Sequence, residues 1–232
     1  MTVLRKAASL DVSGLGCIRG GRVLFRDLSF AVAAGQALVV TGRNGTGKST
    51  LLRSLAGMQP WRAGQMSWCG RQISPQHADY QQQLAYLGHQ TGMSDVLSGL
   101  ENLRFALTTM NMPWEESRVQ AVLRSLALHE VAPRLFGRLS QGQRRRFGLA
   151  RVLLSQRLLW LLDEPGTALD DQGGQWLTQA LTAHLAEGGM AVVASHQPLA
   201  LPATSLRSLV LSSNGDGQAA MCASITEQVT AC

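Results

Sequence analysis

Residues 42–49 read Gly-Arg-Asn-Gly-Thr-Gly-Lys-Ser and fit the pattern G-x-x-x-x-G-K-[ST] of a phosphate-binding loop. An apolar run at 37–41 precedes the loop, as a buried strand would, and residues 50–56 have a helix-forming composition. Glycines let successive backbone N–H groups turn toward phosphate oxygens, and a helix N-terminus adds the positive end of a dipole. The pattern therefore predicts that Lys48 reaches the β- and γ-phosphates of a nucleotide and that the Ser49 hydroxyl holds Mg²⁺. The other loop residues expected to contact the nucleotide are Gly42, Arg43, Asn44, Gly45, Thr46, Gly47 and Thr50.

The chain's 232 residues are enough for one α/β domain with a sizeable core. With 16% charged and 45% hydrophobic residues, the composition is that of a globular protein and not of a disordered one. The formal net charge of +6 suits anionic partners such as nucleotide phosphates, acidic lipid headgroups or nucleic acid. Charge alone does not choose among these partners.

No sequence signal points to secretion or to a membrane span. No apolar run approaches the roughly 20 residues of a membrane-spanning helix, and no apolar segment follows Arg5 and Lys6 as in a secretory signal. The cysteines show neither metal-ligand spacing nor a disulfide pattern, which favours a reduced cytoplasmic setting. There is no C-x-x-C-H, so the chain is not expected to carry haem covalently.

The hydrophobic pattern alternates between strand and helix character, which predicts a parallel sheet. Strands are predicted within 9–41 and at 64–70, 84–87, 158–162, 190–194 and 206–211. Apolar residues recur at helical spacing from 98 to 156, and a further helix is expected around 176–185. The polar stretch 74–83 is also expected to be helical. The tail from residue 212 is polar, and no role is assigned to it.

The predicted strand at 158–162 is apolar throughout, which is typical of a central strand buried on both faces, and it leads into Asp163 and Glu164. This arrangement resembles a Walker B strand, whose terminal carboxylate meets the metal that bridges the phosphates. We expect Asp163 to interact with Mg²⁺, and Glu164 to polarise the water that attacks the γ-phosphate.

Residues 139–143 read Leu-Ser-Gln-Gly-Gln and resemble the LSGGQ signature of the ABC ATPase family. Ser140 and Gly142 would open a helix and so form a second anion site. One chain cannot point both anion sites at the same γ-phosphate. The family's solution is a head-to-tail dimer, in which each nucleotide lies between one phosphate loop and the signature of the other copy. Gln141 replaces the first glycine of the signature, and we expect the site to survive with an altered fit.

Three further residues resemble family elements by position. Gln90 resembles the Q-loop glutamine, which touches Mg²⁺ or its water, and Asp170 resembles the D-loop aspartate. His196 resembles the switch histidine, which hydrogen-bonds the γ-phosphate and positions the water. The resemblance thus implies catalytic roles for Glu164, His196 and Lys48, a Mg²⁺ site of Ser49, Gln90 and Asp163, and additional nucleotide contacts from Gln90, Ser140, Gly142, Gln143 and Asp170. His89 is interpreted as a neighbour of the Q-loop glutamine rather than as a haem ligand.

The resemblance covers about residues 9–211 and implies an α/β fold of the P-loop NTPase class. That fold has a RecA-like core with a parallel sheet, an antiparallel β subdomain and an inserted helical subdomain. A single ABC ATPase domain is expected over 1–232, with the core at about 1–90 and 157–212, the helical subdomain at about 91–156 and a tail at 213–232. The resemblance also implies ATP and Mg²⁺ as cofactors, a homodimer of ATPase subunits and an integral membrane permease subunit as partners.

Within the family, the chain is most similar to the ATP-binding subunit of the c-type cytochrome biogenesis system, the haem exporter subgroup. The stretches that carry this likeness are 86–92, 100–105, 139–145, 159–165, 184–189 and 195–199. The subgroup implies a peripheral protein on the cytoplasmic face of the bacterial inner membrane. There it would drive haem transfer or export, or release of haem-loaded chaperone, with other cytochrome c maturation components.

Two alternatives stay open. One is an ATPase subunit for another cargo, because transport specificity is expected in the membrane subunit. The other is a soluble ABC-type ATPase that acts on nucleic acid. Such relatives usually carry two ATPase units or a long coiled coil, whereas this chain has one unit and no long heptads, so no nucleic acid partner is expected.

Arginines stand at two notable places. The aromatic residue that stacks on adenine in the family is missing, and by spacing Arg19 lies close to its position. A guanidinium can stack on a base plane. The run Arg144, Arg145 and Arg146 is interpreted as a solvated helix face, and contact with lipid headgroups or a partner is the other reading.

Overall fold

Three strands of five residues each, apolar except at Thr41 and Asp163, form the centre of a sheet in the computed structural model, which describes residues 8–211 and 223–227. These strands are β3 (Ala37–Thr41), β7 (Leu159–Asp163) and β8 (Met190–Ala194), and all of their residues except Thr41 are buried. Other parts of the protein cover both faces of these strands, so apolar side chains lie on both faces. This explains why polar and apolar residues do not alternate along them.

The six-stranded sheet has the order β10-β9-β3-β8-β7-β6, and every pair is parallel except β10 with β9. Its remaining strands are β6 (Leu84–Leu87), β9 (Leu206–Leu211) and β10 (Ala223–Glu227). Successive side chains of β7 enter opposite layers of the core. Leu159 and Leu161 join the layer that contains helix α2 (Lys48–Leu55), whereas Trp160 and Leu162 join the layer of the larger helices.

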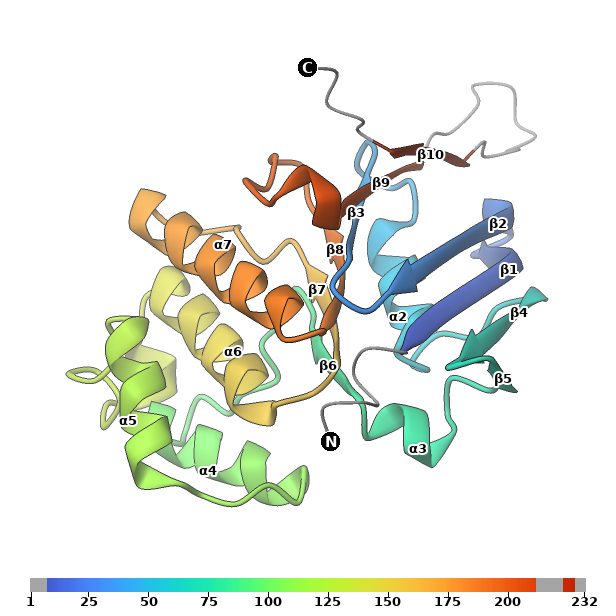
Figure 1. The fold of residues 1–232 in the computed structure, drawn as a ribbon. Coiled ribbons are helices and arrows are strands. Elements are labelled where there is room, and N and C mark those ends of the chain that lie inside the picture. The colour runs from blue at the N-terminus through green and yellow to red at the C-terminus, as the bar shows by residue number, and fades with distance from the viewer. Residues whose placement is uncertain (1–7, 212–222, 228–232) are drawn as a thin grey trace.

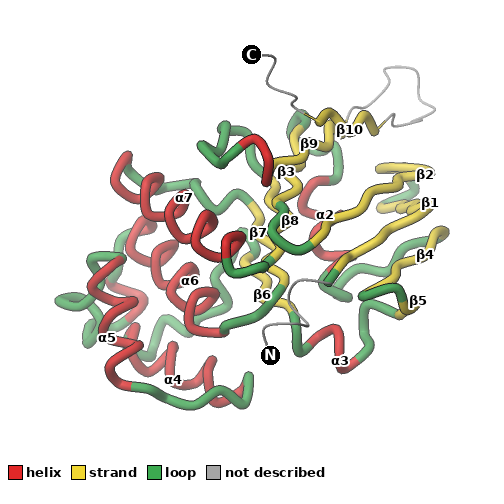
Figure 2. The backbone as a smooth tube through the Cα atoms, viewed as in Figure 1, coloured by secondary structure: helices red, strands yellow, loops and turns green. Residues whose placement is uncertain are grey.

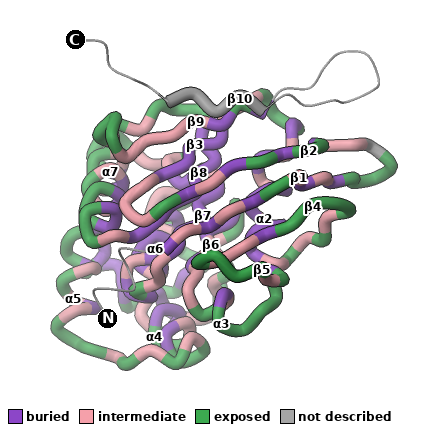
Figure 3. The backbone as a smooth tube through the Cα atoms, turned by 45° about the vertical axis from the view of Figure 1, so that its right-hand side comes forward, coloured by how far each residue is buried: buried purple, intermediate pink, exposed green. Residues whose placement is uncertain are grey.

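A four-stranded antiparallel sheet lies on the far side of α2, in the order β2-β1-β4-β5 (Figure 1). Its strands are β1 (Ser9–Arg19), β2 (Arg22–Ala33), β4 (Ala63–Trp68) and β5 (Arg71–Ile73). Buried and intermediate residues alternate along much of β1 (Figure 3), and its inward side chains, such as Leu10 and Val12, pack into the core around α2. Helix α2, which follows the phosphate loop, is therefore enclosed by a sheet on each side.

The larger helices cover the other face of the parallel sheet (Figure 2). They are α4 (Gly99–Thr109), α5 (Glu116–Ser125), α6 (Gln141–Ser155) and α7 (Asp171–Ala186). Helices α4 and α6 each begin with a capping box, formed by Ser98 with Glu101 and by Ser140 with Gln143. The shorter elements are α3 (Ala78–Gln81) and the 3-10 turns η1 (Phe136–Arg138) and η2 (Ala203–Ser205). Among residues 8–211 and 223–227, no helix combines the length and the apolar character needed to cross a bilayer.

The predicted class, a parallel α/β sheet with an antiparallel sheet and added helices, is confirmed. Two local predictions differ from the structure. Only Ala78–Gln81 of the stretch 74–83 is helical. Residues 74–77 form a turn instead, in which the N–H of His77 donates to the carbonyl oxygen of Ser74 at 2.9 Å. The tail contains strand β10, which the polar pattern did not predict, since pairing at a sheet edge uses backbone groups. The rest of the tail lies outside the described residues.

Candidate functional site

The site lies where four neighbouring parallel strands end. β3, β8, β7 and β6 are adjacent and run the same way, so their carboxyl ends share one edge of the sheet. The phosphate loop follows β3, Asp163 ends β7 with Glu164 directly after it, and His196 follows β8. Residues far apart in the sequence therefore meet because of the strand order.

Lys48, the first residue of α2, has its ammonium group inside the mouth of the loop. The side chain is buried, and Nζ donates to the carbonyl oxygens of Gly42 at 2.8 Å and Arg43 at 3.3 Å. Nζ also lies 3.0 Å from Nε2 of His196. Gly42 has φ 139°, and a Cβ there would lie 2.1 Å from the carbonyl oxygen of Leu211, so only glycine fits at the start of the loop.

Ser49 and Asp163 form the second contact across the site. The Ser49 hydroxyl donates to Oδ1 of Asp163 at 2.9 Å. Asp163 is 1% exposed, and among the described residues its other oxygen, Oδ2, has no hydrogen-bond partner. A buried carboxylate oxygen without a partner, beside a hydroxyl, is the kind of hard oxygen donor set that Mg²⁺ takes.

Glu164 and His196 form the third contact, with Oε1 of Glu164 at 3.2 Å from Nε2 of His196. Glu164 has φ 50°, the left-handed region that non-glycine residues rarely adopt. Its backbone N–H donates to the carbonyl oxygen of Ala194 at 2.9 Å, which continues the β7–β8 pairing past the end of β7. Glu164 therefore combines an unusual backbone conformation with a side chain that faces His196.

The signature residues lie at the start of α6, as predicted for a helix N-terminus. Ser140 is the N-cap, and its hydroxyl accepts from the backbone N–H of Gln143 at 3.2 Å. A Cβ on Gly142 would lie 2.8 Å from the carbonyl oxygen of Ala168, so the signature packs tightly against the loop before α7. Asp170 caps α7 through the backbone N–H of Gly173 at 2.8 Å. In the described part of the chain, the hydrogen bonds of Ser140, Gln143 and Asp170 stay at their own helix ends.

A family model described as ABC transporter matches residues 25–167, which include the phosphate loop, the signature and Glu164. The chain belongs to the ABC transporter family. Members of this family bind and hydrolyse ATP, and this chain is therefore an ABC ATPase.

Three relatives of this ABC ATPase share a name. The cytochrome c biogenesis ATP-binding export protein CcmA of Pseudomonas aeruginosa is 44% identical over 193 residues, which cover 83% of this chain and 94% of that protein. The protein of the same name from Bordetella bronchiseptica is 46% identical over 190 residues, covering 82% and 84%. The one from Vibrio cholerae is 39% identical over 202 residues, covering 87% and 98%.

Solved structures show the same fold. A putative ABC transporter ATP-binding protein from Pyrococcus furiosus has a TM-score of 0.76 at 21% identity and covers 88% of this chain and 97% of its own. A dimeric ATP-binding cassette in a post-hydrolysis state, bound to ADP and phosphate, also has a TM-score of 0.76, at 20% identity, and covers 87% and 94%. At these identities the likeness shows the fold alone.

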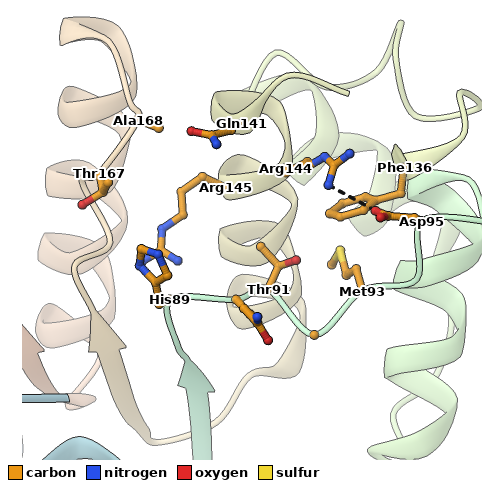
Figure 4. A pocket seen from close by; sticks show the side chains of 12 residues that line it. His89, Thr91, Met93, Asp95, Phe136, Gln141, Arg144, Arg145, Thr167 and Ala168 are labelled. Atoms are coloured by element: carbon orange, nitrogen blue, oxygen red, sulfur yellow. Dashed lines mark ion pairs between the residues drawn. The ribbon is translucent and has the colours of Figure 1, made fainter. Parts of the chain in front are cut away.

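Gln90 lies apart from the three contacts just described. Its side chain is exposed and lines a cavity of about 530 Å³ with Gln141, Arg144 and Thr167, among other residues (Figure 4). Among the described residues, no hydrogen bond joins Gln90 to Ser49 or Asp163. The structure of this ABC ATPase thus places Ser49 and Asp163 together and leaves the glutamine at the edge of the site.

The interpretation of residues 144–146 as a solvated face was wrong for Arg145, which is 6% exposed. Nη1 of Arg145 donates to the carbonyl oxygen of Gly88 at 2.7 Å, and Nη2 donates to the carbonyl oxygens of Asp163 and, at 2.7 Å, Glu164. Burial lowers the pKa of Arg145, while Asp163 and Glu164 counteract that effect. One signal in the sequence was available: position 145 shares a helix face with the buried positions 149 and 152.

The neighbouring arginines also contact the protein. Arg144 pairs with Asp95 at 3.2 Å, and Arg146 lies over the ring of Trp176 at 5.4 Å. Arg19, expected near the base of the nucleotide, is exposed at the end of β1, and its contact with adenine stays a prediction.

Proposed function

We propose that this ABC ATPase is the ATP-hydrolysing subunit of a membrane complex for c-type cytochrome biogenesis. In this role, hydrolysis drives haem transfer or export, or release of haem-loaded chaperone. The observation that carries the proposal is the identity of 39% to 46%, over most of both chains, with proteins named for cytochrome c biogenesis.

Nucleotide binding is assigned to the loop 42–47 and to the residues that open α2. The backbone N–H groups of the loop and of Lys48, Ser49 and Thr50 supply donors for the phosphates. Lys48 supplies the positive charge. The carbonyl oxygens of Gly42 and Arg43 hold the ammonium group at the mouth of the loop. A charged donor in this place suits hydrogen bonds to phosphate oxygens.

Hydrolysis is assigned to Glu164 and His196. The Glu164 carboxylate accepts a proton from water as the water oxygen bonds to the γ-phosphorus, and the bond from that phosphorus to the bridging oxygen of ADP breaks. The products are ADP and inorganic phosphate. His196, 3.2 Å from Glu164, orients the carboxylate and can donate a hydrogen bond to the γ-phosphate.

Ser49 and Asp163 would hold Mg²⁺, since their oxygens lie together and Oδ2 of Asp163 is buried without a partner among the described residues. Gln90 is the third proposed ligand, directly or through water. When bound, Mg²⁺ supplies positive charge that neutralises phosphate oxygens.

A second copy of the chain completes each site in this proposal. Ser140, Gly142, Gln143 and Asp170 lie at helix ends whose hydrogen bonds, in the part of the chain that the structure describes, do not reach the phosphate loop. The dipole of the α6 N-terminus and the Ser140 hydroxyl suit the γ-phosphate held by the other copy.

The chain is proposed to divide into a core at 1–90 and 157–212, a helical subdomain at 91–156 and a tail at 213–232.

A membrane permease subunit and other cytochrome c maturation components are the proposed partners, at the cytoplasmic face of the bacterial inner membrane. The test is affinity purification of the tagged full-length chain from solubilised membranes, followed by identification of the membrane protein that accompanies it. A permease of the cytochrome maturation system supports the proposal, and a permease for another cargo contradicts it.

A cellular assay tests the same proposal by its product. Deleting the chain should abolish covalently bound haem in c-type cytochromes, as measured by haem staining after denaturing electrophoresis. The wild-type chain should restore the stain, and the Glu164→Gln variant should not. Normal staining in the deletion strain would contradict the proposed role.

A further inference from the structure

Arg145 is a buried cation, and its hydrogen-bond partners among the described residues are all backbone carbonyl oxygens. Besides Gly88, Asp163 and Glu164, Nε lies 3.4 Å from the carbonyl oxygen of Pro165. A guanidinium group stays charged in proteins and carries five N–H donors in a planar fork, so it can serve several acceptors at once. In Figure 4 the side chain extends from α6 away from the Arg144–Asp95 pair and toward the segment at His89.

The contacts join three segments of the site. Gly88 directly follows β6 and lies two residues before Gln90, whereas Asp163 ends β7 and Glu164 directly follows it. Arg145 itself stands in the first turns of α6, five residues after the signature serine. One side chain therefore connects the signature helix to the acidic pair and to the start of the glutamine loop.

The backbone of Glu164 is held at both of its peptide groups. Its N–H donates to the carbonyl oxygen of Ala194, and its carbonyl oxygen accepts from Nη2 of Arg145 at 2.7 Å and from the backbone N–H of Thr167 at 3.1 Å. A left-handed backbone at a glutamate is unfavourable by itself, so surrounding contacts must maintain it. Of the contacts to the Glu164 carbonyl oxygen in the described structure, the hydrogen bond from Arg145 is the one that comes from α6.

We propose that Arg145 is a positioning residue for ATP hydrolysis, which acts through the backbone of Glu164 and couples movement of the signature helix to the orientation of that carboxylate. The inference rests on the proposed role of Glu164. If α6 moves relative to β7, the fork of Arg145 leaves the carbonyl oxygens and the glutamate backbone loses one of its three hydrogen bonds. When the signature of one copy closes on the nucleotide of the other copy, Arg145 would therefore change the orientation of Glu164 within its own copy.

The test compares Arg145→Lys with the matched control Arg151→Lys. Arg151 lies on the same helix, is also partly buried, and its Nη2 donates to the carbonyl oxygen of Tyr86 at 2.8 Å, but among the described residues it makes no hydrogen bond to Glu164. Both changes keep the positive charge and remove the planar fork. Steady-state ATP hydrolysis by the full-length chain is measured with Mg-ATP. The concentration of nucleotide-binding sites is determined by titration, and kcat is expressed per site, so that unfolded molecules are not counted.

Arg145→Lys should lower kcat by about 10- to 100-fold, because small displacements of a catalytic group have effects of this size, and should leave the KM for ATP within about threefold. Arg151→Lys should leave kcat per site within about threefold of the wild-type value. Equal kcat values for Arg145→Lys and the wild type, or equal losses in the two variants, would overturn the proposal. If Arg145→Lys does not fold, Arg145→Gln, which keeps two N–H donors, replaces it under the same criteria.

A double variant separates this inference from the function on which it rests. If Arg145 acts through Glu164, adding Arg145→Lys to Glu164→Gln should not lower the residual rate further. A further tenfold loss would show that Arg145 acts independently of the glutamate. A wild-type chain that does not hydrolyse ATP, or a fully active Glu164→Gln variant, would instead contradict the proposed function.

Discussion

His196 lies between a cation and an anion, and its Nε2 cannot serve both in one protonation state. Nε2 is 3.0 Å from Nζ of Lys48 and 3.2 Å from Oε1 of Glu164. A neutral ring with the proton on Nδ1 accepts from Lys48, whereas a ring with the proton on Nε2 donates to Glu164. Nucleotide phosphates that draw Lys48 away would leave Nε2 free to donate.

Glu164→Gln should abolish turnover while ATP still binds. An amide cannot accept the proton of the attacking water, and loss of a general base typically lowers kcat by about 10²- to 10⁴-fold. The measurements are phosphate release and the Kd of a fluorescent ATP analogue, and that Kd should change by less than about threefold. Turnover at the wild-type rate would show that Glu164 does not have the catalytic role.

Lys48→Ala should weaken nucleotide binding itself. The change removes a charged donor to the phosphates, and such bonds contribute about 1.5–3 kcal/mol, or roughly 10- to 150-fold in Kd. Titration calorimetry with ATP measures the effect, and titration with adenosine, which lacks phosphates, is the control that should be unaffected. Unchanged affinity for ATP would rule out the assignment of Lys48 to the phosphates.

At the scale of elements, the strand order of the sheet gathers the site. β8 lies between β3 and β7, which is why the residue after β8 can meet residues after both neighbours. Capping boxes determine where α4 and α6 begin, and the one on α6 also fixes the signature serine. The same capping motif therefore begins both α4, where its role is structural, and α6, which carries the proposed signature.

The capping box of α4 offers a stability test outside the catalytic residues. Ser98→Ala should lower the free energy of unfolding by about 1 kcal/mol, because Ser98 accepts from the backbone N–H of Glu101 and donates to its carboxylate. Chemical denaturation measures this difference. Gln120→Ala, on a helix with no side-chain cap, is the control and should change the free energy by less than about 0.5 kcal/mol. A Ser98→Ala chain as stable as the wild type would contradict the assigned role of the cap.

The same cap predicts a pH dependence. Hydrogen bonds from the backbone and the hydroxyl of Ser98 lower the pKa of Glu101 below its ordinary value of 4.5. The carboxylate form is therefore favoured in the folded state, and its contribution is complete above pH 4.5 and is lost as the pH falls through the lowered pKa. The difference in Tm between wild type and Glu101→Gln should shrink between pH 6 and pH 3. A difference independent of pH would contradict this account.

Several elements could be predicted from the sequence because their signals are local. The phosphate loop, the buried strands with their terminal acids and the helix that starts at Ser140 each follow from a short pattern. The role of Arg145 could not be predicted in this way, since its carbonyl partners lie at the ends of two strands, β6 and β7, that only the fold brings to α6. Strand β10 was missed because its pairing with β9 is made through the backbone.

At the scale of the whole molecule, the proposed site is incomplete in one copy. The phosphate loop and acidic pair lie at the carboxyl edge of the sheet, while Ser140 and Asp170 make their described hydrogen bonds at the starts of α6 and α7. A head-to-tail pair of copies would give each nucleotide both sets of residues. Arg145 would then connect the two sites of the pair, because it joins the signature helix to the acids of its own chain.

Mixing two inactive variants tests this arrangement most directly. In a head-to-tail dimer, Lys48→Ala disables the phosphate loops and Ser140→Arg disables the signatures, so each variant alone should show no ATP hydrolysis. A mixed dimer contains one site with an intact loop from one copy and an intact signature from the other. Random pairing should therefore restore about a quarter of the wild-type rate. A mixture that stays as inactive as the separate variants would contradict the shared site.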